Sequence, residues 1–114
     1  MNGTALYSTE TYIYKVASEH EIRADVHRPL QPKTRAAILW IHGGALIFGN
    51  RKDIAAYQLA EYVKRGYLVV AVDYRLAPET KLDQIAKDIE DAYTWVRKEG
   101  PALFDVDPRR IAIV

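Results

Sequence analysis

The stretch ILWIHGGALIFGN, residues 38–50, decides the fold of this chain of 114 residues. An apolar run over residues 36–41 stops abruptly at His42, Gly43 and Gly44. A short apolar run that ends in glycine predicts a buried strand of a parallel sheet. Adjacent glycines let the backbone turn steeply and let another molecule approach its N–H groups. Because ligands of open α/β sheets bind at the C-terminal ends of the strands, this stretch predicts a strand that carries backbone donors to a site.

Upstream of this strand, residues 11–16 and 22–27 alternate between apolar and polar side chains. This alternation predicts an antiparallel hairpin at the edge of a sheet, with one face wet. The expected inward residues are Tyr12, Tyr14, Val16, Ile22, Ala24 and Val26. Pro29 and Pro32 should end the second strand, since proline cannot donate to the ladder. Residues 1–9 carry no clear pattern.

Downstream of the glycines, residues 53–65 predict a helix that ends at Gly66. Its expected buried stripe is Ala55, Leu59, Tyr62 and Val63. The apolar run over residues 67–72 predicts a second central strand, parallel to the first because a strand-helix-strand unit crosses over right-handed.

A further helix is predicted to begin with a capping box of Thr80 and Asp83 and to stop at Gly100 and Pro101. Its apolar residues at helical spacing are Leu82, Ile85, Ile89, Ala92, Tyr93 and Val96, and its expected solvent face carries Asp83, Lys87, Asp88, Glu90 and Asp91. A fifth strand should begin at Ile111. The pattern predicts one α/β domain over residues 1–114, in which an antiparallel hairpin precedes a parallel sheet with flanking helices.

Composition excludes several classes of function. A net charge of +1 and the absence of basic runs argue against nucleic acid and membrane surfaces as partners. There is no cysteine, hence no disulfide and no thiol nucleophile. His20 and His27 lack metal-ligand spacing and are expected on the surface, so we expect neither metal nor cofactor. The N-terminus lacks the pattern of a signal peptide, and a cytoplasmic location is expected.

Three segments carry a resemblance to a known family. The residues from His42 to Ala45, followed by Phe48 and Gly49, resemble the HGGG-type oxyanion loop of the α/β-hydrolases. DYRLAPE, residues 73–79, resembles the matching loop of the hormone-sensitive-lipase-like esterases. DPRRIAIV, residues 107–114, is similar to the strand that leads into the nucleophile elbow of that family. The three segments follow the family's order, so the chain is expected to be the N-terminal part of an α/β-hydrolase fold.

The resemblance implies roles for eight residues. The N–H groups of Gly43, Gly44 and Ala45 would stabilise the oxyanion of acyl transfer, and the competing interpretation is a tight turn that needs glycine. His42 is expected to hold this loop in place rather than act as the base, because the family's triad histidine follows the nucleophile. The loop support should come from Asp73, Tyr74, Arg75 and Glu79, with Arg75 paired to Glu79 or Asp73, or else simply solvated.

The chain departs from the family pattern where the nucleophile should appear. It ends at Val114, and its only serines are Ser8 and Ser18. We therefore expect part of a serine carboxylesterase or lipase-like hydrolase acting on acyl esters, inactive alone because serine, acid and histidine of the triad are absent. An amide substrate stays open. The alternative is a non-catalytic binding or assembly module derived from a hydrolase. The strand between Ile111 and Val114 should expose an unpaired edge that favours self-association.

Overall fold

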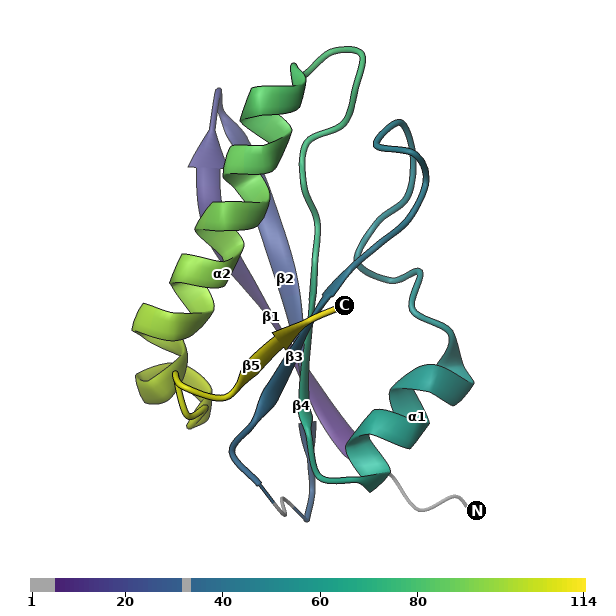
Figure 1. Ribbon diagram of the computed structural model, residues 1–114, viewed down its shortest axis with the longest axis vertical. Coiled ribbons are helices and arrows are strands. Elements are labelled where there is room, and N and C mark those ends of the chain that lie inside the picture. Colours follow the sequence, from purple (N-terminus) through teal and green to yellow (C-terminus); the bar gives the residue numbers. More distant parts are fainter. Residues whose placement is uncertain (1–5, 32–33) are drawn as a thin grey trace.

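The computed structural model describes residues 6–31 and 34–114, and these form a five-stranded sheet with one helix on each face (Figure 1). The elements follow the chain as β1 (Tyr7–Ala17), β2 (His20–Pro29), β3 (Ala37–Ile41), α1 (Ala56–Lys64), β4 (Leu68–Val72), α2 (Leu82–Phe104) and β5 (Ile111–Ile113). The sheet order is β1-β2-β4-β3-β5. The pairs β1–β2 and β2–β4 are antiparallel, whereas β3 pairs in parallel with both β4 and β5. The predicted edge hairpin and the parallel central strands are confirmed.

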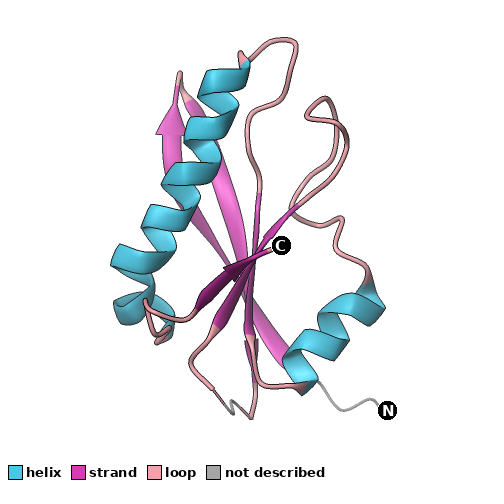
Figure 2. Cartoon of the chain, in the orientation of Figure 1, coloured by secondary structure: helices cyan, strands magenta, loops and turns pink. Residues whose placement is uncertain are grey.

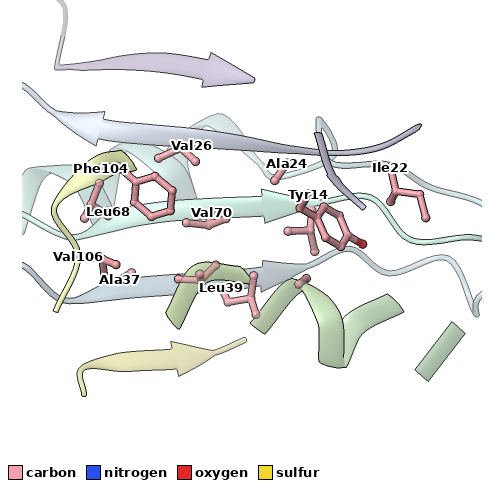
Figure 3. Packing of buried hydrophobic residues seen from close by; sticks show 13 residues of the cluster. Tyr14, Ile22, Ala24, Val26, Ala37, Leu39, Leu68, Val70, Phe104 and Val106 are labelled. Carbon is pink, nitrogen blue, oxygen red and sulfur yellow. The ribbon is translucent and has the colours of Figure 1, made fainter. Parts of the chain in front are cut away.

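The sheet packs differently on its two faces. On one face, α2 closes a core in which Leu68, Val70 and Val72 of β4 meet Val96 and Phe104 (Figure 3). On the other face, α1 covers a smaller cluster of Leu59, Val63 and Val69. Because β4 is buried on both faces, its sequence is continuously apolar, as the sequence predicts for a central strand.

The first strand is longer than predicted and contains a bulge. It begins at Tyr7, within a segment for which no pattern was expected, while residues 1–5 lie outside the described part. The register with β2 shifts between Ile13 and Lys15, which leaves Tyr14 as the extra residue. The predicted inward position of Val16 is therefore wrong: Val16 is 64% exposed. Lys15 turns toward α2 instead and lies 2.7 Å from Asp88.

The two helices depart from their predicted ends. Helix α1 begins at Ala56 rather than at residue 53, because Asp53 belongs to a turn ahead of it. The Asp53 carboxylate accepts the N–H of Asn50, and the N–H of Asp53 donates to the carbonyl of Asn50. Helix α2 begins at Leu82, so the predicted capping box of Thr80 and Asp83 is wrong. Gln84 instead accepts the N–H of the N-cap residue Lys81 at 3.4 Å.

Helix α2 also continues through Gly100 and Pro101, where the sequence predicts a stop. A Cβ on Gly100 would stand 2.6 Å from Val106 and 2.9 Å from the Phe104 ring, so this glycine allows close packing. Phe104 and Val106 are fully buried. Packing of these side chains thus outweighs the helix hydrogen bond that Pro101 cannot donate.

The loops after β3 and β4 leave the same end of the sheet, as parallel strands require (Figure 2). The loop of residues 42–50 follows β3 and is called the glycine loop below. The 73–81 loop follows β4. No helix within residues 6–31 and 34–114 is long and apolar enough to cross a membrane.

Candidate active site

The glycine loop folds into a tight turn around one carbonyl group. The carbonyl of Gly44 accepts the N–H groups of Ile47 at 3.0 Å and Phe48 at 3.2 Å. Gly44 has a φ of 115°, and a Cβ there would stand 1.8 Å from the Phe48 carbonyl oxygen, so only glycine fits. Gly43 differs, because nothing lies within 4 Å of its would-be Cβ. Ala45 takes a left-handed φ of 55°.

Three consecutive N–H groups on this loop stay outside the backbone ladder. Among the loop and turn hydrogen bonds of the described residues, none is donated to a backbone carbonyl by Gly43, Gly44 or Ala45. Gly43 and Ala45 are exposed and Gly44 is half-buried. The turn therefore presents adjacent backbone donors at the C-terminal end of a central parallel strand, a geometry suited to a negatively charged oxygen.

His42 is buried beneath this turn. Its Nδ1 lies 2.7 Å from the carbonyl oxygen of Gly43, and because a carbonyl only accepts, Nδ1 carries the proton. The ring stacks on Tyr74 with centroids 4.1 Å apart, and the Tyr74 hydroxyl donates to the His42 carbonyl at 2.8 Å. Burial raises the pKa of Tyr74 and keeps its hydroxyl a donor. A Cβ on Gly49 would stand 2.5 Å from His42 Nδ1, so Gly49 makes room for the imidazole.

A second contact joins the two loops directly. The N–H of Ala77 in the 73–81 loop donates to the carbonyl of Leu46 at 2.8 Å. Together with the Tyr74–His42 pair, this bond holds the glycine loop against the loop that follows β4.

Asp73 supports the glycine loop through an arginine that the sequence did not single out. Its carboxylate accepts the backbone N–H and Nη1 of Arg51, each at 2.7 Å. Nε of Arg51 donates to Asp25 at 2.9 Å. Burial lowers the pKa of Arg51, but the hydrogen bonds to Asp25 and Asp73 outweigh it and raise that pKa. Asp25 itself is buried, although the alternating pattern placed it on the wet face of its strand.

Arg75 does not pair with Glu79 or Asp73, and that prediction is wrong. Its Nε and Nη2 donate to the two oxygens of Asp88, each at 2.9 Å, and its backbone N–H donates to the same carboxylate at 2.9 Å. Asp88 is fully buried, so its predicted place on the solvent face of the helix is also wrong. The tertiary pairing explains why: a carboxylate with a bidentate arginine partner is stable inside.

Glu79 is exposed and enters none of the ion pairs of residues 6–31 and 34–114. It lines an open hollow of about 450 Å³ beside the 73–81 loop, together with Tyr74, Arg75 and His20. Of the predicted support residues, the structure thus packs Tyr74 against His42 of the glycine loop and bonds Asp73 to Arg51, directly after that loop. It places Arg75 one step behind them and leaves Glu79 at the rim.

The remaining histidines and the serines lie elsewhere. His20 is exposed in the hairpin, as predicted. His27 is buried, against prediction, because Thr9 hydrogen-bonds its Nδ1 at 2.8 Å and Tyr7 packs edge-on to its ring. Ser8 and Ser18 are exposed on β1 and the hairpin turn. Within the described ranges, no group of three acidic or histidine side chains could hold a metal ion.

The chain is similar to known proteins in both sequence and structure. The BD-FAE family model matches residues 24–114. Among curated proteins, the chain is 39% identical over 119 residues to the non-reducing polyketide synthase atr1 of Stereocaulon alpinum, covering 95% of this chain. It is 40% identical over 103 residues to the non-reducing polyketide synthase adrD of Penicillium roqueforti, covering 86% of this chain. The chain spans only 5% and 4% of those two proteins.

Solved esterase structures superpose on most of the chain. The thermophilic esterase Est2 of Thermogutta terrifontis is 26% identical, with a TM-score of 0.82 over 92% of this chain and 39% of its own. A bacterial heroin esterase is also 26% identical, with a TM-score of 0.82 over 95% of this chain and 34% of its own. The chain belongs to the BD-FAE family and has the fold of the N-terminal part of an esterase-like α/β-hydrolase.

Proposed function

We propose that this chain supplies the oxyanion hole of a serine ester hydrolase, with the N–H groups of Gly43, Gly44 and Ala45 as the donors. The observation that carries the proposal is the turn of the glycine loop, which leaves these three N–H groups adjacent and uncommitted to the backbone ladder among the described residues. The likeness to esterases in both family and fold supports it. The substrate class is an acyl ester of the kind that carboxylesterases and lipases cleave.

The chemistry follows from where charge develops. When a nucleophile attacks an ester carbonyl, its oxygen becomes an oxyanion, and donors fixed in advance stabilise it without reorganisation. Removal of one such donor costs roughly a hundredfold to a thousandfold in turnover. His42 contributes by position only, since its Nδ1–H donates to the Gly43 carbonyl and thereby orients the peptide unit between Gly43 and Gly44.

We propose further that the 114-residue chain does not turn over esters alone, because it contains no serine near the glycine loop. The test is an assay of the purified chain on 4-nitrophenyl butyrate with and without phenylmethylsulfonyl fluoride. We expect hydrolysis no faster than the buffer reaction. Turnover that the sulfonyl fluoride abolishes would contradict inactivity.

The donors can be tested apart from catalysis. Methylphosphonate carries tetrahedral anionic oxygens like those of the acyl-transfer intermediate, and tert-butanol is a neutral control of similar size. In an ¹⁵N-labelled chain, we expect saturable shifts of the amides of Gly43, Gly44 and Ala45 with methylphosphonate and none with tert-butanol. If methylphosphonate does not shift these amides, the support for an oxyanion hole is removed and a non-catalytic module remains.

Ala45 offers a second variant, since it stands where the family often has a third glycine. Its φ of 55° is costly for a residue with a Cβ. Ala45→Gly keeps the N–H and relieves this strain, so we expect it to bind methylphosphonate at least as tightly as the unaltered chain.

A further inference from the structure

A buried cluster of charges lies behind the 73–81 loop. Asp88 of α2 accepts three hydrogen bonds from Arg75 and an ion pair from Lys15 at 2.7 Å. Lys15 also reaches Asp91 at 2.7 Å. Burial by itself would raise the pKa of Asp88, but the hydrogen bonds from Arg75 and Lys15 outweigh it and lower that pKa, so the carboxylate stays charged.

The bulge in β1 is what brings Lys15 into this cluster. In a regular strand Lys15 would point away from the face that carries Tyr14. The register shift at Tyr14 instead turns both residues toward α2. The Tyr14 hydroxyl donates to the carbonyl of Asp73, so the bulge also contacts the start of the 73–81 loop.

A short path of contacts leads from this cluster to the glycine loop. The carboxylate of Asp88 holds the backbone N–H of Arg75. The preceding residue, Tyr74, stacks on His42 and donates to its carbonyl. His42 is bonded through Nδ1 to the carbonyl of Gly43, the first of the three residues whose N–H groups stay outside the backbone ladder.

We propose that Lys15 and Asp88 are positioning residues for the glycine loop, acting through the backbone of Arg75 and the ring of Tyr74. The importance of this positioning for ester cleavage rests on the proposed function. The effect of Lys15 and Asp88 on the glycine loop does not rest on that function, because it is measured as amide hydrogen exchange in the loop and not as binding or turnover.

The test is residue-resolved amide hydrogen exchange by NMR on the 114-residue chain. The reporters are the hydrogen-bonded amides of Ile47, Phe48 and Ala77, and the amides of β4 report the core. In Lys15→Met we expect the three reporters to exchange roughly tenfold faster while β4 is unchanged. Lys15→Arg, which keeps the charge, should restore slow exchange.

Lys87→Met is the matched control. Lys87 also pairs with Asp91, at 3.1 Å, but it is exposed, and among the ion pairs of the described residues none joins it to Asp88. We expect this variant to leave the reporters unchanged. Equal acceleration of β4 and the reporters in Lys15→Met would mean a merely structural role and overturn the proposal, as would an unchanged loop.

Tyr74→Phe tests the last link independently of whether Lys15→Met folds well. It removes only the hydroxyl bond to His42 and leaves the cluster of Lys15, Asp88 and Arg75 intact. We expect faster exchange at Ile47 and Phe48 with α2 unaffected. Reporters that exchange as in the unaltered chain would overturn the proposed path through Tyr74.

Discussion

The phenol ring of Tyr74 lies flat on the imidazole of His42, with centroids 4.1 Å apart and planes within 5°. The same tyrosine donates its hydroxyl to the carbonyl of His42 at 2.8 Å. Two residues separated by 32 positions thus share a face contact and a hydrogen bond. His42 is the first residue after β3, and Tyr74 is the second residue after β4. Contacts between them therefore fix the two loops relative to each other.

The two adjacent glycines should respond very differently to alanine. Gly44→Ala places a Cβ against the Phe48 carbonyl at a φ of 115°, so we expect a loss of at least about 1–3 kcal/mol in the free energy of unfolding. Gly43→Ala meets nothing within 4 Å and should change it by less than about 0.5 kcal/mol. Urea titrations followed by circular dichroism make the comparison. Equal losses would contradict the turn geometry.

Neutralising Asp88 should be costly. Asp88→Asn leaves the cations of Arg75 and Lys15 next to a neutral buried group, and breaking a buried pair in this way costs roughly 3–5 kcal/mol. Glu90→Gln removes a carboxylate that is exposed and pairs only loosely with Lys87, at 3.3 Å, so a change within about 0.5 kcal/mol is expected. A mild effect of Asp88→Asn in urea unfolding would argue against the buried cluster.

Stability should fall in two steps on acidification. Burial lowers the pKa of His27 below its ordinary 6.5, with Asp25 partly opposing the effect. As the pH falls through 6.5, the unfolded chain takes up a proton that the folded chain refuses, so stability decreases until the folded pKa is passed. The lowered pKa values of Asp88 and Asp91 add a second loss as the pH falls below their ordinary 3.8.

The first of these steps can be assigned by substitution. His27→Gln should remove the decline that begins at pH 6.5, whereas His20→Gln, at an exposed site, should keep it. The measurement is urea unfolding between pH 7.5 and 4.5. A decline that persists in His27→Gln would show that another group is responsible.

We propose that copies of the chain associate through β5. One edge of this strand pairs with β3, and the other edge has no partner strand among the described residues. Val114 continues that ladder through bonds to Leu39 and Ile41, and Ile113 is 56% exposed. Antiparallel pairing of two such edges is self-complementary.

Sedimentation velocity tests this association. The Ile113→Lys variant should contain a larger fraction of monomer than the unaltered chain, since a charge on an edge strand opposes pairing. Leu82→Lys introduces the same charge at an exposed site of α2 and should have no effect. If the unaltered chain stays monomeric at high concentration, the proposal is contradicted.

The local sequence pattern predicted the helices and strands well where burial alone determines which residue types occur. The run over residues 36–41 and the run over residues 67–72 became β3 and β4, each within one residue of the predicted bounds. Local pattern failed where side chains compensate each other over distance. His27 looked like a surface residue because Thr9, its hydrogen-bond partner, lies 18 positions away on the paired strand.

The glycine loop shows the same division within one segment. Its turn and its place after a central strand could be predicted, because glycine chemistry is local. Its bracing by Arg51, the residue directly after it, could not, since an arginine in a loop is usually solvated. The role of Gly43, Gly44 and Ala45 in catalysis stays a prediction.

The sequence by itself determined the order of the strands and helices and the position of the glycine turn, because apolar periodicity and glycine are read from neighbouring residues. Only the tertiary structure decided that Lys15, Asp88 and Arg75 meet in one buried cluster. Their charges look like ordinary surface charges until a bulge in β1 and a helix 73 positions further along the chain bring opposite signs within 3 Å, where mutual hydrogen bonding replaces water.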